Sequence, residues 1–551
     1  MRRASLLLLL LAGMALRSTA QQFIVIDTQD GRQVVEASDV GSITLERDGA
    51  FYARLLPEAI AADPATTLFG EALKRTGLAD SIRAFVDETY PIMSENERKR
   101  NAYTEAAFYW CMVPEVRRRC FTAFVETNAT FAAHGIRSLS DLEAYARKVY
   151  DEAFPEDVTV TDPTDRRHPL NRFVAYHLLP FGSTFDELTP NALLFYRDLT
   201  DASDWYQTLL PCASLKCARP RFDDCIYLNR RGISDGPDRY GVQVRGARIV
   251  AGADGALTQT VANGAYYYID DLLTYGLQTQ HQALNERWRL SATSLSPDFM
   301  NMAIRSVREY PVYSVPRYFF LDGKADNMHF AEPTEAYVEF PQLFMWQWDT
   351  EVNFFPCGTK GKGGCDLTLA LPALPEGEYE LRFGCTARSE LPRVRFSVNG
   401  VVLADSVDFC DNYQLHAERT GWKPYTTDSA EVCVRREMRE KGWMPGPQER
   451  ALCTIVPGTP YDEPTSANSI PMRSAAQMCR AIVGRFHSDG RHAPTLRIES
   501  LPHTYQEIQD LIGYVTYVGV NADAPYSQPV VLDYIELCPI WIADNEEIPE
   551  D

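Results

Sequence analysis

The sequence predicts an α+β domain followed by an all-β sandwich, and three observations support that fold class. Apolar residues between 55 and 275 follow helical spacing in some stretches and strand spacing in others. From about residue 336 they recur at every second position, which is typical of half-buried strands. The length of 551 residues is sufficient for both parts, since one domain commonly takes about 100–200 residues.

The composition is that of a folded, acidic protein. Hydrophobic residues make up 45% of the chain, charged residues 23% and aromatic residues 11%, which argues against extensive disorder. The formal net charge is −21. General affinity for nucleic acids depends on clustered lysine and arginine, so this charge argues against a nucleic-acid binder.

Residues 1–20 have the features of an export signal. Two arginines precede the apolar run Leu6–Leu11, and Ala20 offers a small residue for cleavage. The run is too short for a good membrane span, and no cysteine follows it to carry a lipid anchor. We therefore expect an exported protein without an integral membrane segment, located in the periplasm, at the cell surface or outside the cell, with 21–54 as an N-terminal segment.

Within 55–275 the elements follow from local patterns. Phe121–Val125 is a short apolar strand. Ser140 is expected to cap a helix whose apolar residues lie on one face. Asn263-Gly264 is expected to form the turn between two strands.

Three motifs in this part resemble the fasciclin-like domain family. Residues 121–132, which include Thr127 and Asn128, resemble its first signature. Residues 173–179, around Tyr176 and His177, are similar to its second signature, and Asn263-Gly264 resembles the turn before its closing strand. Val125-Glu126 departs from the usual Ala-Pro, and the cysteine-bearing stretch 203–236 has the character of an insertion. The resemblance covers 55–275 and implies an adhesive function.

The four motif residues each allow two interpretations. The family resemblance places Tyr176 and His177 in an adhesive segment, whereas their apolar neighbours favour a buried ring pair whose imidazole bonds to a backbone carbonyl. Thr127 and Asn128 are either contact residues or a turn-forming pair. We favour the structural interpretation for both pairs.

Residues 276–335 are expected to form a connector that packs between the domains, followed by the sandwich at 336–543 and an acidic tail at 544–551. Residues 379–385 and 394–398 alternate as strands, and Asn399-Gly400 is a strong hairpin signal. The stretch 411–470 is rich in proline, glycine and charge and is expected to form long loops.

The second part has a resemblance of its own. Residues 377–382, the hairpin at 399–400 and residues 532–539 look like the jelly-roll, galactose-binding-like sandwiches of carbohydrate-binding modules. The combination of the two parts resembles bacterial exported fasciclin-domain proteins associated with polysaccharide utilisation. This resemblance implies glycan binding.

The chain has 13 cysteines, which export would allow to pair as disulfides. Cys357 and Cys365 flank a glycine-rich loop and form a possible disulfide. Tetrahedral zinc needs paired ligand spacings that the cysteines do not provide, so no metal site is predicted.

Aromatic residues are the candidate ligand contacts, because a sugar ring stacks on an exposed aromatic face. Trp346 and Trp348 lie two apart on an expected strand and therefore share a face, which is either a platform or part of the core. Trp422, Tyr425 and Trp443 lie in the expected loops, where exposure is the simpler interpretation.

No common hydrolase, metalloprotease or nucleotide-binding motif occurs in the sequence, so neither a catalytic residue nor a cofactor is predicted. The sequence thus favours a non-catalytic adhesion or glycan-binding protein whose partner is a glycan or a surface or matrix protein. Two alternatives stay open: a structural component of a surface or envelope complex, and a secreted enzyme acting on polysaccharide with an acid pair at 411–510.

Overall fold

The computed structural model describes residues 23–28, 31–36, 54–88, 111–112, 117–189, 202–220, 223, 225–232, 236–301, 317–320, 325–331, 336–339, 352–355, 365–385, 391–410, 413–423, 428–446, 450–452, 469–471, 479–513, 522–523 and 530–546. The chain forms two compact units, Met1–Tyr52 and Ala53–Asp551. The first unit contains an antiparallel pair, β1 (Phe23–Thr28) and β2 (Gly31–Glu36). The expected export signal lies outside the described residues.

The second unit begins with an α+β part built on an eight-stranded sheet. The strand order is β5-β4-β11-β9-β8-β7-β6, with β10 paired to β11. β4 and β11 are parallel and the other pairs are antiparallel. The strands are β4 (Phe121–Glu126), β5 (Leu178–Leu179), β6 (Ala202–Gln207), β7 (Ser214–Arg219), β8 (Tyr227–Leu228), β9 (Ala247–Val250), β10 (Gln259–Val261) and β11 (Gly264–Ile269).

The sheet confirms the predicted strand and moves the predicted turn by one residue. All six residues of β4 are buried, as the apolar stretch at Phe121–Val125 predicts for a strand covered on both faces. The hairpin between β10 and β11 turns at Ala262 and Asn263, and Gly264 is the first residue of β11. The expected insertion at 203–236 supplies most of β6 and all of β7 and β8, so it extends this sheet along one edge.

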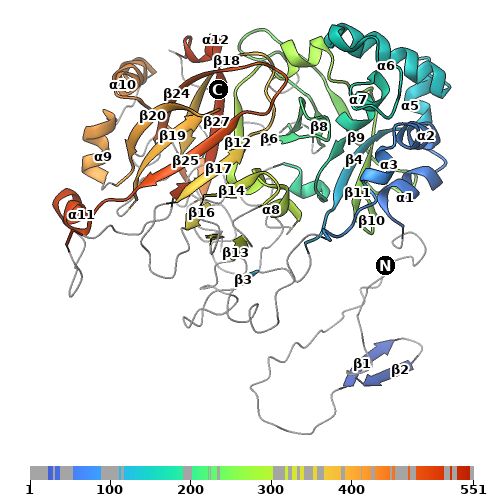
Figure 1. Ribbon diagram of the computed structural model, residues 1–551, viewed down its shortest axis with the longest axis horizontal. Helices are drawn as coiled ribbons and strands as arrows, with labels where there is room; N and C mark the ends of the chain where they lie inside the picture. Colours follow the sequence, from blue (N-terminus) through green and yellow to red (C-terminus); the bar gives the residue numbers. More distant parts are fainter. Residues whose placement is uncertain are drawn as a thin grey trace. The chain divides into compact units, whose positions relative to one another are not determined.

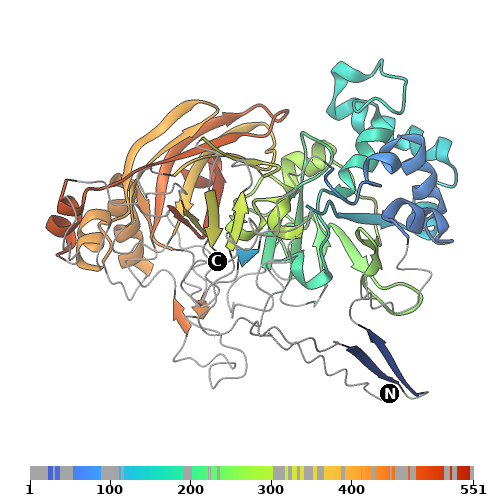
Figure 2. The ribbon, with the colours of Figure 1, turned by 60° about the horizontal axis from the view of Figure 1, so that its bottom comes forward.

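Helices pack beside this sheet, and Figures 1 and 2 both show them gathered next to its strands. The longest has buried Leu142, Ala146 and Tyr150 on one face. Its N-cap is Ser138, whose hydroxyl accepts the Asp141 amide, so the helix begins earlier than the expected cap at Ser140. The helices are α1 (Leu56–Ala62), α2 (Thr67–Arg75), α3 (Leu78–Ser81), α5 (Asn128–Ala133), α6 (Leu139–Ala153) and α7 (Pro169–Tyr176).

The remainder of the unit contains two five-stranded antiparallel sheets that form a sandwich-like arrangement, in agreement with the predicted all-β part. Their cores meet where the Phe383 and Phe396 rings lie 5.0 Å apart. The first sheet is β12 (Trp288–Ser291), β27 (Tyr534–Pro539), β18 (Gly377–Gly384), β24 (Arg480–Ser488) and β21 (Trp443–Met444). The second is β14 (Met328–Phe330), β17 (Asp366–Ala370), β25 (Thr495–Leu501), β19 (Arg393–Val398) and β20 (Val401–Asp408).

The expected hairpin at Asn399-Gly400 is present. Val398 pairs with Val401, which leaves a two-residue loop with φ of 50° at Asn399 and 79° at Gly400. Positive φ at both positions defines the type I′ turn that matches the strand twist. The asparagine and glycine therefore have the conformation that the sequence predicts.

A third five-stranded sheet and a two-stranded sheet complete the strands that the structure describes. The third sheet joins one short strand from the N-terminal half to four strands from the C-terminal half. These are β3 (Cys111–Met112), β13 (Arg317–Phe320), β15 (Ala336–Glu339), β16 (Val352–Phe355) and β26 (Val530–Leu532), with β22 (Arg450–Leu452) and β23 (Ser469–Pro471) as the separate pair.

The stretch expected to form long loops, 411–470, instead contains two helices. In α10 (Asp428–Glu440), Val434 and Met438 are buried at a spacing of four, so one apolar stripe fixes the helix despite its high charge. The density of polar residues hid this spacing in the sequence. Figure 1 shows α9 and α10 beside the sandwich strands. The remaining helices are α8 (Pro297–Asn301), α9 (Tyr413–Thr420), α11 (Tyr505–Ile512) and α12 (Ile540–Ala543).

The α+β part and the sandwich make direct contacts. The Trp205 ring of β6 stacks on Trp288 of β12, with ring centroids 5.9 Å apart and planes at 12°. The Ser214 hydroxyl donates to the Ala373 carbonyl at 2.7 Å, and the Ala373 amide donates to Gln207 at 2.8 Å. Because β12 and β14 both come from 276–335, the expected connector supplies strands of the sandwich itself.

No helix in the described ranges is both long and apolar enough to cross a membrane.

Candidate functional site

The side chains of Thr127 and Asn128 form hydrogen bonds to other residues of the α+β part. The Thr127 hydroxyl caps α5 by accepting the Thr130 amide at 3.1 Å. The Asn128 side chain donates to Pro64 O and Thr67 Oγ1, both at 2.9 Å, and accepts the Leu68 amide at 3.1 Å. These contacts tie the end of β4 to the loop between α1 and α2, which supports the structural interpretation of this pair.

Tyr176 links helix α7 to strand β7 of the sheet. Its hydroxyl donates to the Ser214 carbonyl at 3.0 Å and accepts from Asn229 Nδ2 at 2.9 Å. The side chain is fully buried, and burial raises the pKa of this phenol well above its ordinary value. The phenol is therefore neutral and inaccessible to a partner on the surface.

His177 lies next to a buried carboxyl group. Its Nδ1 donates to the Phe173 carbonyl at 2.7 Å, and Nε2 lies 2.9 Å from Glu126 Oε1. Both side chains are 0% exposed. A carbonyl oxygen only accepts, so Nδ1 carries a proton, and a second proton must lie between Nε2 and the carboxyl group. The expected imidazole-to-carbonyl bond is present, together with a partner that the sequence did not reveal.

Two of the five candidate aromatic residues are described, and both are buried. Trp422 and Trp443 are each 5% exposed. The Trp443 ring meets Phe409 and His416 edge to face, because α9 covers it. Neither ring offers a broad face to a sugar in this structure. The other three, Trp346, Trp348 and Tyr425, lie outside the described residues, and their proposed role in binding stays a prediction.

The cysteines that the structure describes with their side chains are free thiols. Cys365 is among them, and its expected partner Cys357 lies outside the described residues. Burial raises the pKa of Cys365 and raises that of Cys538 to about 12, so both thiols resist ionisation and oxidation. Among the described residues, no group of His, Cys, Asp and Glu could hold a metal ion.

One face of the first sandwich sheet has a buried network of charged side chains. The register aligns Arg289, Glu536 and Arg382 across β12, β27 and β18. Arg382 Nη1 donates to Glu536 at 2.6 Å and Arg289 Nε at 2.7 Å, and Arg480 of β24 bonds to the same carboxylate. Arg382 alternates along β18 with Leu381 and Phe383, which pack into the sandwich core, so the network lies on the opposite face of the sheet.

Two further glutamates extend the network toward helix α10. Arg382 donates to Glu380 Oε1 at 2.8 Å and to Glu546 Oε2 at 2.6 Å. Arg439 of α10 donates to Glu380 Oε2 at 2.7 Å, and Arg287 pairs with Glu546. The C-terminal residues after α12 are thereby joined to the sheet.

The arginines control the ionisation of Glu536. Burial opposes its charge, but the attraction of Arg480, Arg289 and Arg382 outweighs burial and lowers the pKa of this carboxyl group. Reciprocally, Arg382 is fully buried, yet the Glu546 and Glu536 carboxylates raise its pKa above the ordinary value. Glu536 and Arg382 are therefore both charged throughout the neutral pH range.

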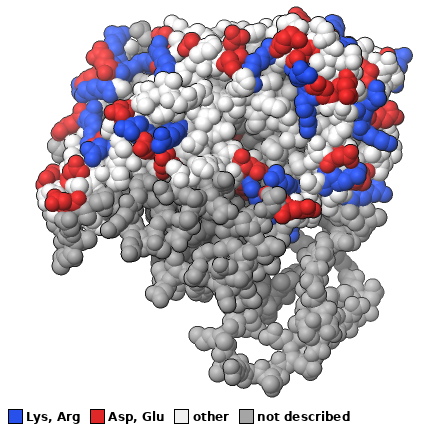
Figure 3. Space-filling view, viewed as in Figure 1, with Lys and Arg blue, Asp and Glu red and all other residues white. Residues whose placement is uncertain are grey.

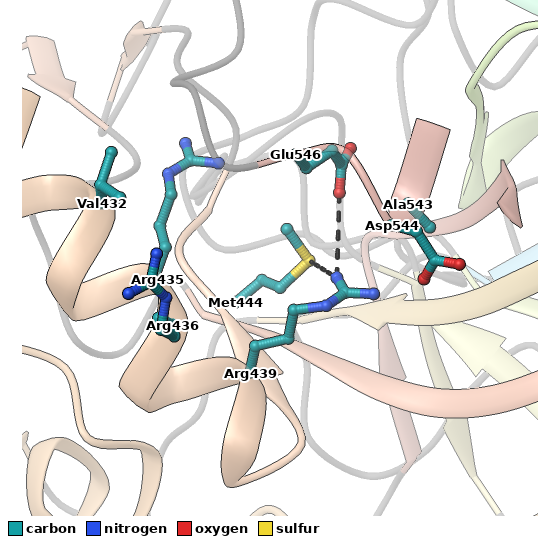
Figure 4. Close-up of a pocket in the computed structure, with 8 residues that line it drawn as sticks. All are labelled: Val432, Arg435, Arg436, Arg439, Met444, Ala543, Asp544 and Glu546. Atoms are coloured by element: carbon teal, nitrogen blue, oxygen red, sulfur yellow. Dashed lines mark hydrogen bonds and ion pairs between the residues drawn. The ribbon is translucent and has the colours of Figure 1, made fainter. Parts of the chain in front are cut away.

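A cavity of about 120 Å³ lies beside the network, between α10 and the residues that follow β27. Figure 4 shows Val432, Arg435 and Arg436 of α10 on one side of the cavity and Ala543 and Asp544 on the other, while Arg439 extends past Met444 and pairs with Glu546 at 4.0 Å. We call it the arginine cavity, and its lining consists of Val432, Arg435, Arg436, Arg439, Met444, Ala543, Asp544 and Glu546.

The arginine cavity combines buried and accessible groups. Arg435 is 4% exposed, whereas Arg436 is exposed. Asp544 pairs with Arg485 of β24, outside the lining, and Glu546 bonds to Arg382, also outside it. Guanidinium groups that converge on a small space can bind carboxylate, sulfate or phosphate oxygens.

An exposed aromatic residue stands one helical turn before Asp544. Trp541 of α12 is 39% exposed, and its Nε1 donates to Asn285 Oδ1 at 2.8 Å. The Tyr240 ring meets it edge to face at 4.8 Å. No sequence pattern singled out Trp541, Arg435, Arg436 or Arg439 as candidates. Arg435 and Arg439 are four residues apart and therefore lie on one face of α10. That spacing could have indicated a cationic face only if the helix itself had been predicted.

A comparison with models of known protein families gives no match, and a comparison with curated proteins gives none either.

Proposed function

We propose that this chain is a non-catalytic exported adhesion or glycan-binding protein that holds its ligand on the sandwich side. The observation that carries the proposal is the arginine cavity, which lies on the outer side of a sandwich sheet close to the exposed Trp541. Ligand sites are usually concave and carry a few convergent polar groups, and this cavity has such groups although it is smaller than most. The fasciclin-like and carbohydrate-module-like motifs support the same assignment.

The buried charges next to the cavity also support a functional site. Taking charged groups out of water is costly, and apolar replacements of such networks are often neutral or stabilising. A network centred on Glu536 and Arg382, both 0% exposed, is therefore a poor device for stability alone. It does hold the neighbouring Arg439 in position, as a binding site requires.

The motif residues contribute to the proposal indirectly. Tyr176, His177 and Asn128 bond inside the α+β part, so we assign them to its stability and place ligand contact elsewhere. The face drawn in Figure 3 has acidic and basic side chains interspersed rather than a broad field of one sign. A local site, rather than long-range attraction, would then select the ligand.

Affinity electrophoresis of residues 21–551 through gels that contain soluble polysaccharides tests the proposal. Retardation by one polysaccharide class, without release of reducing ends, is the expected result. Release of reducing ends that one carboxylate-to-amide change abolishes would instead identify an enzyme. A stable co-purifying protein, with no retardation in any gel, would identify a structural component of a complex.

A further inference from the structure

Two cysteines stand at the ends of neighbouring strands in the first sandwich sheet. Cys385 directly follows β18, and Cys479 directly precedes β24. The two strands are antiparallel, and the pair at this end of their ladder is Gly384 with Arg480. When the register continues by one position, Cys385 stands directly opposite Cys479.

Both cysteines belong to the face of the sheet that packs into the sandwich core. Side chains alternate along a strand, so Cys385 shares its face with Phe383, and Cys479 shares its face with Ala481. Phe383 and Ala481 pair across the ladder, and all four residues are 1% exposed. The two thiols are therefore on the same side of the sheet, as a bond between them requires.

The spacing of such a pair suits a disulfide. Opposite residues of an antiparallel ladder have Cα atoms about 4.5–5.5 Å apart, and a disulfide spans about 4.4–6.8 Å between Cα atoms. Two other strand cysteines provide a contrast: Cys217 faces Asp204 and Leu228, and Cys538 faces Glu380. Neither of those two meets a cysteine at these ladder positions.

We propose that Cys385 and Cys479 form a disulfide while the exported chain folds. The structure holds both as reduced thiols, and the inference rests on the export that the proposed function includes. The bond would close a loop of about 95 residues, and a cross-link of this kind stabilises a fold by restricting the unfolded chain. That loop contains α10, which supplies much of the lining of the arginine cavity. The disulfide thus joins the two strands between which the cavity segment extends.

The bond forms by thiol–disulfide exchange with a disulfide oxidoreductase, which accepts the electrons. The thiolate of one cysteine attacks the oxidoreductase disulfide, which breaks that bond, forms a mixed disulfide and releases one oxidoreductase thiol. The second cysteine thiolate then attacks the mixed disulfide and releases the other oxidoreductase thiol. Two protons and two electrons pass from the chain to the oxidoreductase. Because Cys385 and Cys479 are 1% exposed once folded, the exchange precedes their burial.

Peptide mapping without reduction tests the inference. Trypsin separates the two cysteines, because peptides 383–388 and 474–480 contain one cysteine each. Residues 21–551 are produced in the periplasm of a bacterial host, alkylated with iodoacetamide in urea and digested. We expect the two peptides joined, with the sum of their masses less two hydrogens. The same chain produced in the reducing cytosol should yield both peptides separately alkylated.

Two variants provide the controls. Cys385→Ala should leave peptide 474–480 alkylated at Cys479, whereas Cys433→Ala, at an exposed thiol of α10, should leave the joined pair intact. Separately alkylated peptides from the exported chain, or either peptide joined to a different cysteine, would overturn the inference. That result in a chain that polysaccharide gels still retard would leave the proposed function standing. A joined pair in a chain that no gel retards would support the disulfide and count against the proposed function.

Discussion

At the scale of single residues, the strongest sequence motif is explained by internal bonding. His177 bonds to Phe173 in its own helix and to Glu126 at the end of β4, while Leu273 donates to the same carboxyl group at 3.0 Å. One buried pair thus joins a helix, a strand and the segment after β11. We infer that the motif exists for the stability of the α+β part.

Removing the imidazole should destabilise the chain more than neutralising its partner does. His177→Leu leaves the buried Glu126 with the Leu273 amide but without the imidazole that compensates it, which costs about 3–5 kcal/mol. In Glu126→Gln the side chain keeps its shape, but His177 Nε2 and the Leu273 amide meet the same atom, so an amide group satisfies only one of them and the change should cost about 1–3 kcal/mol. Urea unfolding of both variants measures the difference.

His492→Gln is the matched control, since that ring is 83% exposed and pairs only at the surface with Asp489. It should change the unfolding free energy by less than about 0.5 kcal/mol. A stable His177→Leu variant that has lost a binding activity would contradict the structural interpretation and support the adhesive one.

The cysteines should differ widely in reactivity. Cys433 is exposed, whereas Cys365 and Cys538 are 1% and 0% exposed with raised pKa values. Alkylation requires an accessible thiolate, so Cys433 should be modified at least about tenfold faster than either buried thiol. Timed iodoacetamide labelling of the native chain, followed by peptide mass spectrometry, measures this ratio. Equal rates would contradict the burial of those two thiols.

At the scale of elements, the close pairing of β11 with β4 depends on a glycine at the start of β11. A Cβ at Gly264 would stand 1.8 Å from the Phe121 carbonyl oxygen, and φ there is +141°. Gly255 has φ of +80° with nothing within 4 Å of a Cβ. Gly255→Ala should therefore cost about 1–2 kcal/mol from the backbone alone.

Gly264→Ala should add a further loss of about 1–3 kcal/mol, because the methyl group forces β4 away from β11. Thermal or urea unfolding of the two variants, compared with the native chain, isolates the steric part. Equal losses at the two positions would show that β4 and β11 do not approach as closely as described.

The elements that the sequence predicted are those with local signals. The hairpin at Asn399-Gly400 follows from two residues that accept positive φ, and β18 follows from strict alternation. By contrast, α10 was hidden because only Val434 and Met438 mark its buried stripe among many charges. Burial of Trp443 depends on the helix packed over it, so its surroundings could not be derived from its own neighbours in the sequence.

At the scale of the whole molecule, the charge network joins distant parts of the chain. Arg382 and Glu546 are 164 positions apart, and Arg289 and Glu536 are 247 apart. The second pair depends on how β12 aligns with β27, and the first on where the chain returns to the sheet after α12; neither follows from a local pattern in the sequence. This explains why the sequence predicted the sandwich but not the cavity beside it.

The network should make stability depend on pH in the acid range. The pKa of Glu536 is lowered in the folded chain from an ordinary value of 4.5. Its contribution is therefore fully present above that value and is lost as pH falls through the lowered folded pKa. Glu536→Gln removes the carboxyl group and with it this pH-dependent stabilisation. The free energy of unfolding of the variant should therefore change less with pH than that of the native chain, by up to about 1.4 kcal/mol per pH unit.

Urea unfolding of both chains between pH 6 and pH 3 measures this difference in slope. The variant should also be less stable at pH 6, because Arg289, Arg382 and Arg480 lose a shared carboxylate. Parallel slopes over the whole range would show that this carboxyl group is not held ionised by the arginines.

The central claim is the proposed one, that this chain holds a glycan at the arginine cavity. The most direct measurement is a glycan array probed with residues 21–551, with Arg436→Glu and with Arg75→Glu, the control at an exposed arginine of α2. We predict that the native chain and Arg75→Glu bind the same class of glycans, and that Arg436→Glu loses them. Binding of no glycan by the native chain, or equal binding by all three chains, would contradict the claim.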